Sequence, residues 1–371
     1  MKRNKSIIII LVLVIAIGAF ALYAIQRGPG LFIKPPTEAR IAFISNQNGQ
    51  SDLMTMKIDG SDVVSLTNDA ANESEPTWSP DMTEILYLSD KNDQKNQAFI
   101  SGWNGKYSRQ VTHSAGIKDN PRWMGRGNEI SVLSSGNLYM VDKHGGHEEE
   151  ALKPSELLGP QAEGELRVPF VYADWSPKVD AILLAQETDL GQVAYILQTT
   201  PGRMSDVQNL KPIDITLARN LDVAWSPVGL RVAAGFINRD GQNGLLVKDF
   251  NSMNITELFV SKIMGAAKPV WSPDGKTIAF EMWSIKDDVP EKCLGIYTID
   301  ASGGKPRPIV KGDAREPFWS PDGSALVYTL ARPDGDRDIW RMNADGTGAV
   351  NLTNGKGDNS SPVWSPARKR S

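Results

Sequence analysis

The sequence predicts an all-β chain: a β-propeller of seven four-stranded blades, closed by the C-terminal strand and preceded by one transmembrane α-helix. Two observations lead to this prediction. A Trp-Ser-Pro motif recurs along the chain, and one uncharged apolar block lies near the N-terminus. The composition, with 40% hydrophobic and 23% charged residues among 371, is that of a globular chain and excludes disorder or a polytopic membrane protein. The expected segments are a cytoplasmic N-terminus (1–6), the transmembrane helix (7–25), a linker (26–38), the propeller (39–366) and a basic tail (367–371).

The apolar block supports a single membrane crossing. Ile7 to Ile25 are nineteen residues without a charge, and as a helix they would span roughly the 30 Å of a bilayer core. Lys2, Arg3 and Lys5 precede the block, so the positive-inside rule places the N-terminus in the cytoplasm and the propeller in the periplasm or at the cell exterior. A cleaved signal peptide is the alternative, because Ala19-Phe20-Ala21 resembles a cleavage site. The block is longer than a signal core of about 7 to 15 residues, which favours the uncleaved anchor.

The segment after the block and the charge balance restrict the remaining possibilities. Glycines and prolines between residues 26 and 38 are typical of a linker. Beyond residue 34 the chain has 35 basic and 44 acidic side chains, a formal charge of −9. This acidity argues against nucleic acid as a partner, because phosphate binding requires a basic surface. The single cysteine, Cys293, excludes an intrachain disulfide and is expected to be a buried small hydrophobe.

The tryptophan motif has the period of a propeller. Its spacings along the chain are 45, 52, 50, 46, 48 and 45 residues, which is the length of a four-stranded blade. Seven of the ten tryptophans therefore occupy one structural position of a repeat, and one copy, Trp123-Met124-Gly125, is degraded. The repeat tryptophans are Trp78, Trp123, Trp175, Trp225, Trp271, Trp319 and Trp364.

The copy that begins at Trp319 shows how one unit folds. Its Ser-Pro-Asp-Gly step suits a type I turn, with proline second and glycine fourth. The turn joins a strand that ends at the tryptophan to a second strand over 325–330. A polar loop, a third strand over 338–342, an Asp-Gly turn and a fourth strand over 349–352 follow.

Seven second strands can be counted, but the first unit lacks a tryptophan strand and the last tryptophan has no unit after it. These two defects complement each other. We expect Pro362 to Trp364 to supply the innermost strand of the blade whose other strands come from residues 39–66, which removes open sheet edges. Six or eight blades are the alternatives.

The repeat resembles a known family. The pattern P-x-W-S-P-D-G-x-x-I-A-F, clearest at Pro269 to Phe280 and Pro317 to Tyr328, together with Leu-Thr after the fourth strand, resembles the WD-repeat-like propeller repeats of the TolB C-terminal domain family. The resemblance covers about residues 39–366. It implies a propeller that binds other envelope proteins, but with six blades and an additional N-terminal α/β domain. This chain departs from that pattern in its anchor, in lacking room for that domain and in its seven predicted blades.

Enzyme and metal signatures are weak. Propellers of this kind also accompany serine peptidases, but the chain has no G-x-S-x-G and its three histidines all lie in the first half. His144-Gly-Gly-His147, followed by three glutamates, is expected to be an exposed turn rather than a zinc site. The loop at Asp334 alternates carboxylates but lacks the spacing of a calcium loop. We expect no catalytic residues, no metal and no cofactor.

The candidate binding residues stand three positions before each tryptophan, where they would ring one mouth of the central channel. Their chemistry varies from blade to blade, as a site on a symmetric scaffold requires and as solvent exposure also permits. Trp283 lies outside the repeat position and is a candidate exposed anchor or a cover for its blade. The face would also carry the insertion Leu157 to Val171 and the loop at 283–290. The channel-mouth candidates are Glu75, Asn120, Tyr172, Asp222, Lys268, Glu316 and Ser361.

Together these observations predict a membrane-anchored, non-catalytic binding platform for an envelope protein, peptide or glycan. The alternative is a propeller enzyme of the lyase or glycosidase type, which would act on extracellular polysaccharide through carboxylates at the channel mouth such as Glu75 with Glu316 or Asp222.

Overall fold

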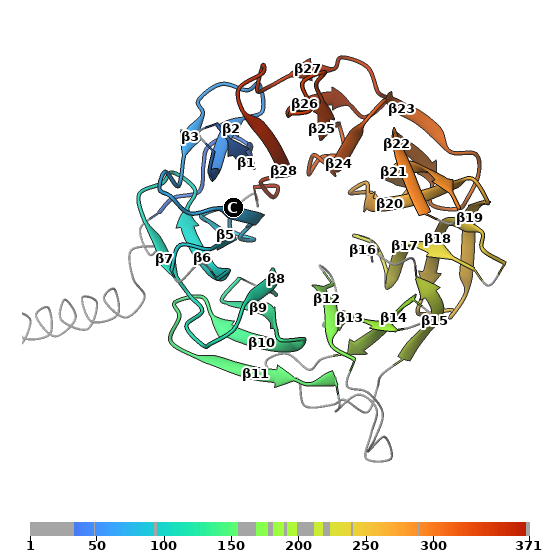
Figure 1. Cartoon of the computed structure of the whole chain (residues 1–371), viewed down its shortest axis with the longest axis horizontal. Helices are drawn as coiled ribbons and strands as arrows, with labels where there is room; N and C mark the ends of the chain where they lie inside the picture. Colours follow the sequence, from blue (N-terminus) through green and yellow to red (C-terminus); the bar gives the residue numbers. More distant parts are fainter. Residues whose placement is uncertain are drawn as a thin grey trace, which may run out of the picture.

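The computed structural model describes residues 33–47, 49–92, 95–125, 127–154, 168–176, 181–188, 191–198, 211–217, 223–238, 240–287 and 289–368. These residues form seven blades of four strands around a central opening (Figure 1), so the predicted all-β architecture and blade number are confirmed. None of the described segments is a helix with the length and apolarity needed to cross a bilayer. The predicted transmembrane helix, residues 7–25, lies outside the described residues.

Each blade is an antiparallel sheet whose innermost strand lines the opening. From the innermost strand outward, blade 1 comprises β28 (Asp358–Trp364), β1 (Arg40–Asn46), β2 (Ser51–Lys57) and β3 (Val64–Ser65). Blade 2 comprises β4 (Glu73–Trp78), β5 (Glu84–Ser89), β6 (Gln97–Gly102) and β7 (Ser108–Gln110). Blade 3 comprises β8 (Lys118–Met124), β9 (Glu129–Ser134), β10 (Asn137–Asp142) and β11 (Glu148–Leu152). Blades 4 and 5 comprise β12 (Phe170–Trp175), β13 (Ala181–Thr188), β14 (Gly191–Gln198), β15 (Lys211–Leu217); and β16 (Val223–Trp225), β17 (Arg231–Ile237), β18 (Asn243–Asp249), β19 (Ile255–Ser261). Blades 6 and 7 comprise β20 (Met264–Trp271), β21 (Thr277–Lys286), β22 (Val289–Asp300), β23 (Arg307–Lys311); and β24 (Ala314–Trp319), β25 (Ala325–Ala331), β26 (Arg337–Asn343), β27 (Val350–Asn351).

The ring is closed by the two ends of the propeller sequence. Strand β28 pairs antiparallel with β1, in the register Ile41 to Trp364 and Asn46 to Asp358. Figure 1 shows this as the dark red strand beside the blue blade. The predicted closure is confirmed, although the closing strand begins at Asp358 rather than at Pro362. Because blade 1 draws strands from both ends of the chain, the described ring has no open seam.

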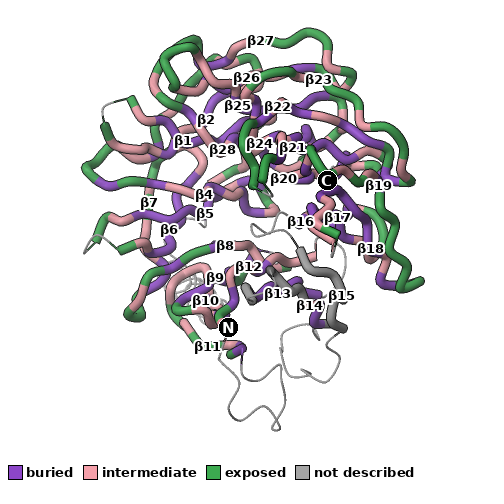
Figure 2. Tube along the Cα trace, turned by 45° about the vertical axis from the view of Figure 1, so that its right-hand side comes forward, coloured by how far each residue is buried: buried purple, intermediate pink, exposed green. Residues whose placement is uncertain are grey.

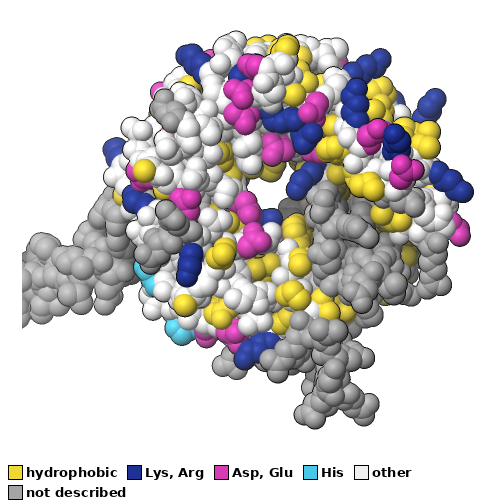
Figure 3. All heavy atoms as spheres, in the orientation of Figure 1, with side chains coloured by type: hydrophobic (Ala, Val, Ile, Leu, Met, Phe, Trp, Pro, Cys, Tyr) yellow, Lys and Arg dark blue, Asp and Glu magenta, His cyan; other side chains and the backbone are white. Residues whose placement is uncertain are grey.

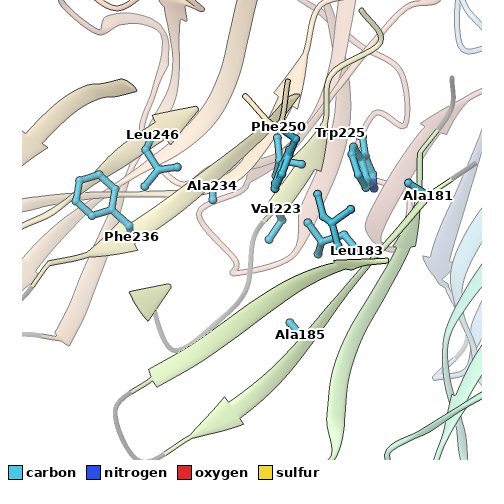
Figure 4. Close-up of a cluster of buried hydrophobic side chains, with 11 residues drawn as sticks. Ala181, Leu183, Ala185, Val223, Trp225, Ala234, Phe236, Leu246 and Phe250 are labelled. Atoms are coloured by element: carbon cyan, nitrogen blue, oxygen red, sulfur yellow. The ribbon is translucent and has the colours of Figure 1, made fainter. Parts of the chain in front are cut away.

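The hydrophobic core is divided among the blade interfaces. A buried apolar cluster lies between each pair of neighbouring blades, and Figure 4 shows the one between blades 4 and 5, around Trp225, Phe236 and Leu183. Alternate residues of β17 face opposite clusters: Val232, Ala234 and Phe236 pack toward blade 4, whereas Ala233 packs toward blade 6. Both faces of the central strands are therefore apolar, and Figure 2 shows exposure gathered in turns and along outer strands such as β19.

The turns after the tryptophans form as the sequence predicts. In blade 6 the Gly275 N–H donates to the Ser272 carbonyl at 2.8 Å, the bond that closes a four-residue turn. The Ser272 hydroxyl donates to Asp274 at 2.7 Å and accepts from the Thr277 N–H at 2.9 Å. Blade 7 repeats these contacts at Ser320 and Asp322. In blades 6 and 7 the Ser-Pro-Asp-Gly step thus fixes how the innermost strand joins the next strand.

The repeat tryptophans connect neighbouring blades. In five blades the indole N–H donates to the backbone carbonyl of the residue that precedes the tryptophan of the previous blade, at 3.0–3.2 Å. Trp175 donates instead to the Ser131 hydroxyl at 2.7 Å. The Trp364 Nε1 is buried and has no hydrogen-bond partner among the described residues. The five regular donors are Trp78, Trp123, Trp225, Trp271 and Trp319.

Candidate binding site at the channel mouth

The channel-mouth candidates occupy equivalent places on the innermost strands. Six of the seven are described, and Asp222 lies outside the described residues. Five have a left-handed backbone, with φ between 48° and 55°. Each of these five falls at a break in register between its innermost strand and the neighbouring strand. They are Glu75, Asn120, Lys268, Glu316 and Ser361.

The five strained residues share one sequence feature. All five residues precede a proline, which disfavours the right-handed helical region for the residue before it. A β-bulge then takes the extra residue and turns its side chain out of the strand. A left-handed conformation costs a non-glycine residue on the order of 1 kcal/mol or more. Tyr172, which is followed by Ala173 rather than proline, does not have this backbone.

Two of the five strained side chains hold blades together. The Asn120 Oδ1 accepts from the Ala173 N–H of blade 4 at 2.9 Å. The Glu316 Oε2 accepts from the Ser361 N–H of blade 1 at 2.9 Å, and the Glu316 N–H itself donates to Glu281 at 2.8 Å. Both side chains therefore satisfy backbone groups across a blade interface.

Glu75 belongs instead to a group of charged side chains from three blades. The Arg122 guanidinium lies 3.8 Å from the Glu75 carboxylate and 3.3 Å from the Asp174 carboxylate. It also lies over the Tyr172 ring, 5.8 Å from the ring centroid. We call Glu75, Arg122, Tyr172 and Asp174 the mouth cluster. Between 25% and 39% of the three charged side chains is accessible, so they are neither core residues nor freely solvated.

The environment changes the protonation of this cluster. Burial between blades raises the pKa of Glu75 to about 7; Arg122 and Lys268 oppose the rise, and the neighbouring Asp119 carboxyl adds to it. Because 39% of the Glu75 side chain is accessible, solvent screens part of this effect. Burial likewise raises the pKa of Asp174, against the opposing effect of Arg122. A carboxyl whose pKa lies near neutrality can donate as well as accept hydrogen bonds at physiological pH.

Lys268 and Tyr172 complete the mouth. Lys268 is exposed on β20 of blade 6, and its charge acts on Glu75 of blade 2, so the two lie within electrostatic reach across the channel. The Tyr172 hydroxyl donates to the Val223 carbonyl of blade 5 at 3.3 Å. Figure 3 shows the central hollow, with acidic, basic and hydrophobic side chains on its rim.

Arg122 and Asp174 were not among the sequence candidates. Both directly precede a repeat tryptophan, two residues beyond the candidate position. The sequence does carry a signal, because this position also varies among blades, with threonine, arginine, aspartate, alanine, valine, phenylalanine and valine in order from Thr77. Nothing in the spacing reveals that Arg122 meets carboxylates of both neighbouring blades.

Trp283 lies on β21 and is partly buried. Its indole N–H donates to Glu281 at 3.0 Å, and the Arg315 guanidinium lies 4.8 Å from the centroid of one of its rings. Arg315 in turn bonds Asp313 at 2.6 Å. Trp283 is thus covered by a neighbouring blade's arginine. The insertion Leu157 to Val171 lies mostly outside the described residues.

The remaining polar motifs have partners within the fold. Arg332 reaches all three carboxylates of the acidic loop, Asp334 at 3.2 Å, Asp336 at 2.8 Å and Asp338 at 3.0 Å, and so places a cation of the chain itself among them. No group of three or more potential metal ligands occurs among the described residues. Cys293 is buried, and burial raises the pKa of its thiol to about 11, which keeps it protonated.

The histidine turn between β10 and β11 spreads its side chains over different partners. His147 contacts Glu149 at 3.0 Å. Glu148 contacts Lys118 at 3.3 Å, and Glu150 contacts Lys153 at 2.8 Å. The three glutamates therefore do not converge on one point.

Comparison with known proteins supports the fold. The sequence profile of the TolB beta propeller domain matches residues 22–157, the part that holds β1 to β11. No curated protein sequence matches the chain. The structure of TolB from Acinetobacter baumannii is similar with a TM-score of 0.55 and 16% identity, over 89% of this chain and 67% of that one.

Two further solved structures have the same architecture. The β-propeller domain of the Trilobed protease from Pyrococcus furiosus, described as having an open velcro topology, is similar with a TM-score of 0.58 and 11% identity, over 86% of this chain and 94% of that one. A puromycin hydrolase mutant is similar with a TM-score of 0.61 and 13% identity, over 86% of this chain but only 52% of that one. At these identities the similarity concerns the fold alone: the chain is a β-propeller closed by β28 on β1, and its residues 22–157 match the TolB beta propeller domain.

Proposed function

We propose that this chain is a single-pass membrane protein whose extracytoplasmic propeller is a non-catalytic binding platform for an envelope protein, peptide or glycan. The observation that carries the proposal is the mouth cluster. Its charged groups come from blades 2, 3 and 4; Glu75 has a strained backbone, and the pKa values of Glu75 and Asp174 are raised. Strain and shifted pKa values that coincide at a concave site are typical of functional residues.

The direction in which the chain enters the propeller supports this arrangement. Arg40 begins β1 beside the end of β28, where its N–H donates to the Ser365 hydroxyl at 3.1 Å. Just before it, the Lys34 carbonyl accepts from the Trp103 indole at 2.9 Å. The Arg40 contact lies where the innermost strand β28 ends, whereas Glu75 lies near the start of its innermost strand β4. An anchor that precedes residue 33 would therefore attach below the ring and leave the mouth facing away from the membrane.

The test is photocrosslinking of the full chain in its native membrane, with a photoreactive residue in place of Tyr172. We expect a discrete crosslinked partner that weakens when Arg122→Lys and Glu75→Gln are introduced. The matched control is Asp274→Asn with Lys276→Ala, two exposed turn residues at the opposite end of the blades. Partner capture that is unaffected by the mouth variants, or reduced equally by the control, would show that the mouth is not the binding surface.

A second candidate function rests on Glu75 alone. Its pKa of about 7, next to the Asp119 carboxyl, is suited to general acid–base work, and paired carboxylates serve glycosidases. We propose an enzyme acting on extracellular polysaccharide as this alternative, with Asp119 rather than Glu316 as the partner of Glu75. Turnover of a polysaccharide by the full chain, abolished by Glu75→Gln, would favour it; saturable binding without turnover would favour the platform.

A further inference from the structure

A second row of side chains lines the channel two residues beyond the channel-mouth candidates, and two of its members, Arg122 and Asp174, also belong to the mouth cluster. It consists of the residue that directly precedes each repeat tryptophan, and each member is partly or fully exposed although the residue before it is buried. A side chain exposed in the middle of an innermost strand opens toward the channel, because its own blade and the two neighbouring blades cover the other directions. We call this row the second tier: Thr77, Arg122, Asp174, Ala224, Val270, Phe318 and Val363.

The second tier has two chemically different halves. Blades 2, 3 and 4 contribute polar groups: Thr77, and Arg122 bonded to Asp174 at 3.3 Å. Blades 5, 6, 7 and 1 contribute only apolar side chains. Among these is Phe318, which is 37% exposed on β24. An exposed phenylalanine inside a channel is unusual, because burying an aromatic ring is one of the largest favourable terms available to a fold.

The charges of the mouth cluster are offset by charges around the channel. Arg122 offsets Asp174 in the second tier, and Lys268 lies opposite Glu75 at the mouth. Arginine donates, carboxylates accept, and Glu75 does either near neutral pH. Such a surface offers hydrogen bonds in both directions without favouring a strongly charged ligand.

Five of the seven second-tier residues are held by the indole of the next blade; the two outside this set are Arg122 and Phe318, because Trp175 donates to Ser131 and the Trp364 Nε1 has no partner among the described residues. The backbone carbonyls of Thr77, Asp174, Ala224, Val270 and Val363 accept from the indoles of the next blade at 3.0–3.2 Å. The mouth residues are fixed by bulges. A preformed site of this kind loses little conformational entropy when it binds.

We propose that the channel binds a neutral pyranose unit of a glycan, with the hydroxyl edge of the sugar on Arg122, Asp174 and Glu75 and its C–H face on Phe318. A pyranose has one polar edge and one apolar face, as the second tier has, and its hydroxyls both donate and accept. This inference rests on the proposed function, because it names the ligand of the same site. A small apolar wall with a few placed polar groups is the usual composition of a ligand site.

The test is binding of defined oligosaccharides to the full chain in lipid nanodiscs, measured by calorimetry and ligand-observed NMR. The probes are cellotetraose and the tetramer of N-acetylglucosamine as neutral glycans, tetragalacturonate as an acidic glycan, and tetra-alanine as a peptide. We expect a neutral glycan to bind at least about tenfold more tightly than the acidic glycan or the peptide. Phe318→Ala should weaken that binding about tenfold or more, as loss of an aromatic contact does.

Two controls keep the result interpretable. Phe318→Tyr retains the ring and should stay within about threefold of the unmodified chain, while Ile263→Ala, which removes an exposed apolar side chain outside the second tier, should have no effect. Equal binding by Phe318→Ala, or preference for the acidic glycan or the peptide, would overturn the inference. Absence of glycan binding together with a crosslinked partner at the mouth would overturn the glycan and leave the platform standing. Absence of both would overturn both.

Discussion

At the scale of single residues, the mouth contains a residue, Glu75, whose backbone conformation and whose environment are both unfavourable. Glu75 combines a left-handed backbone with a carboxyl whose pKa lies far above its ordinary value. Burial is the main cause, and the carboxyl of Asp119 adds to it. The left-handed backbone and the buried carboxyl both lower the stability of the fold, and they provide a group that changes protonation near neutral pH.

The raised pKa of Glu75 predicts how the stability of the fold changes with pH. Because the pKa of Glu75 is about 7 in the folded chain against 4.5 ordinarily, the folded state holds a proton that the unfolded state releases between those values. Protonation of Glu75 therefore stabilises the folded state fully below pH 4.5, and this stabilisation is lost as pH rises through 7. Glu75→Gln should therefore stabilise the chain, relative to the unmodified protein, more at pH 8 than at pH 5 in denaturant unfolding. Glu257→Gln, an exposed carboxyl on β19, is the control; the same pH profile in both variants would refute the assignment to Glu75.

At the scale of elements, the innermost strand does two tasks. Its tryptophan ties the blade to the previous blade, and the residues one and three positions before the tryptophan present side chains to the channel. The ties are specific: the Trp271 indole donates to the Ala224 carbonyl at 3.0 Å, whereas the Trp364 Nε1 is buried without a partner among the described residues. The blade interfaces are therefore alike in packing but differ in hydrogen bonding.

The difference between these two tryptophans is measurable. Trp271→Phe and Trp364→Phe remove similar apolar volume from similar positions, with the side chains 7% and 5% exposed. Only the first removes a satisfied indole donor and leaves a carbonyl unpaired, a loss of about 1 kcal/mol. We expect Trp271→Phe to be the more destabilising substitution by about that amount in chemical unfolding. Equal losses from the two substitutions would mean that the indole bonds add nothing to packing.

At the scale of the whole molecule, closure joins the two ends of the propeller in one sheet. Strand β28 gives blade 1 its fourth strand and contributes Trp364 to the core between blades 7 and 1. Arg337 and Arg332 of blade 7 add bonds to Asp358 and Gly357 at 2.8 and 3.0 Å. The ring is thus held at its closing interface by pairing, apolar packing and polar contacts together.

Removal of the closing strand should uncouple the ring. A chain that ends after Gly357 exposes the edge of β1 and half of one core cluster, so we expect a lower melting temperature, a broader transition and association through the free edge. Addition of a peptide with the sequence of residues 358–366 should restore the transition. A chain that ends after Pro366, which lacks only the tail, is the control. Unchanged melting of the shorter chain would show that six complete blades suffice.

The sequence by itself determined the number of blades, the turns and the ring closure. Each of these follows from local chemistry repeated at a fixed period: tryptophan at one core position, Ser-Pro-Asp-Gly at one turn, and two incomplete units that complete each other. It also placed Glu75, Tyr172 and Lys268 on innermost strands. Because the motif is repeated at a fixed spacing, the degraded copy at Trp123 can still be recognised by its position, and it forms an innermost strand like the others.

Only the tertiary structure decided which of those residues meet. Glu75, Arg122 and Asp174 come from three blades, and their contacts depend on the ring's curvature and on where each bulge turns a side chain. It likewise decided that Asn120 and Glu316 satisfy backbone groups of neighbouring blades rather than facing the channel unpaired. The physical reason is the distance along the chain over which each feature is determined. A turn or strand depends on neighbouring residues, whereas a site that spans blades depends on the backbone path of about a hundred residues.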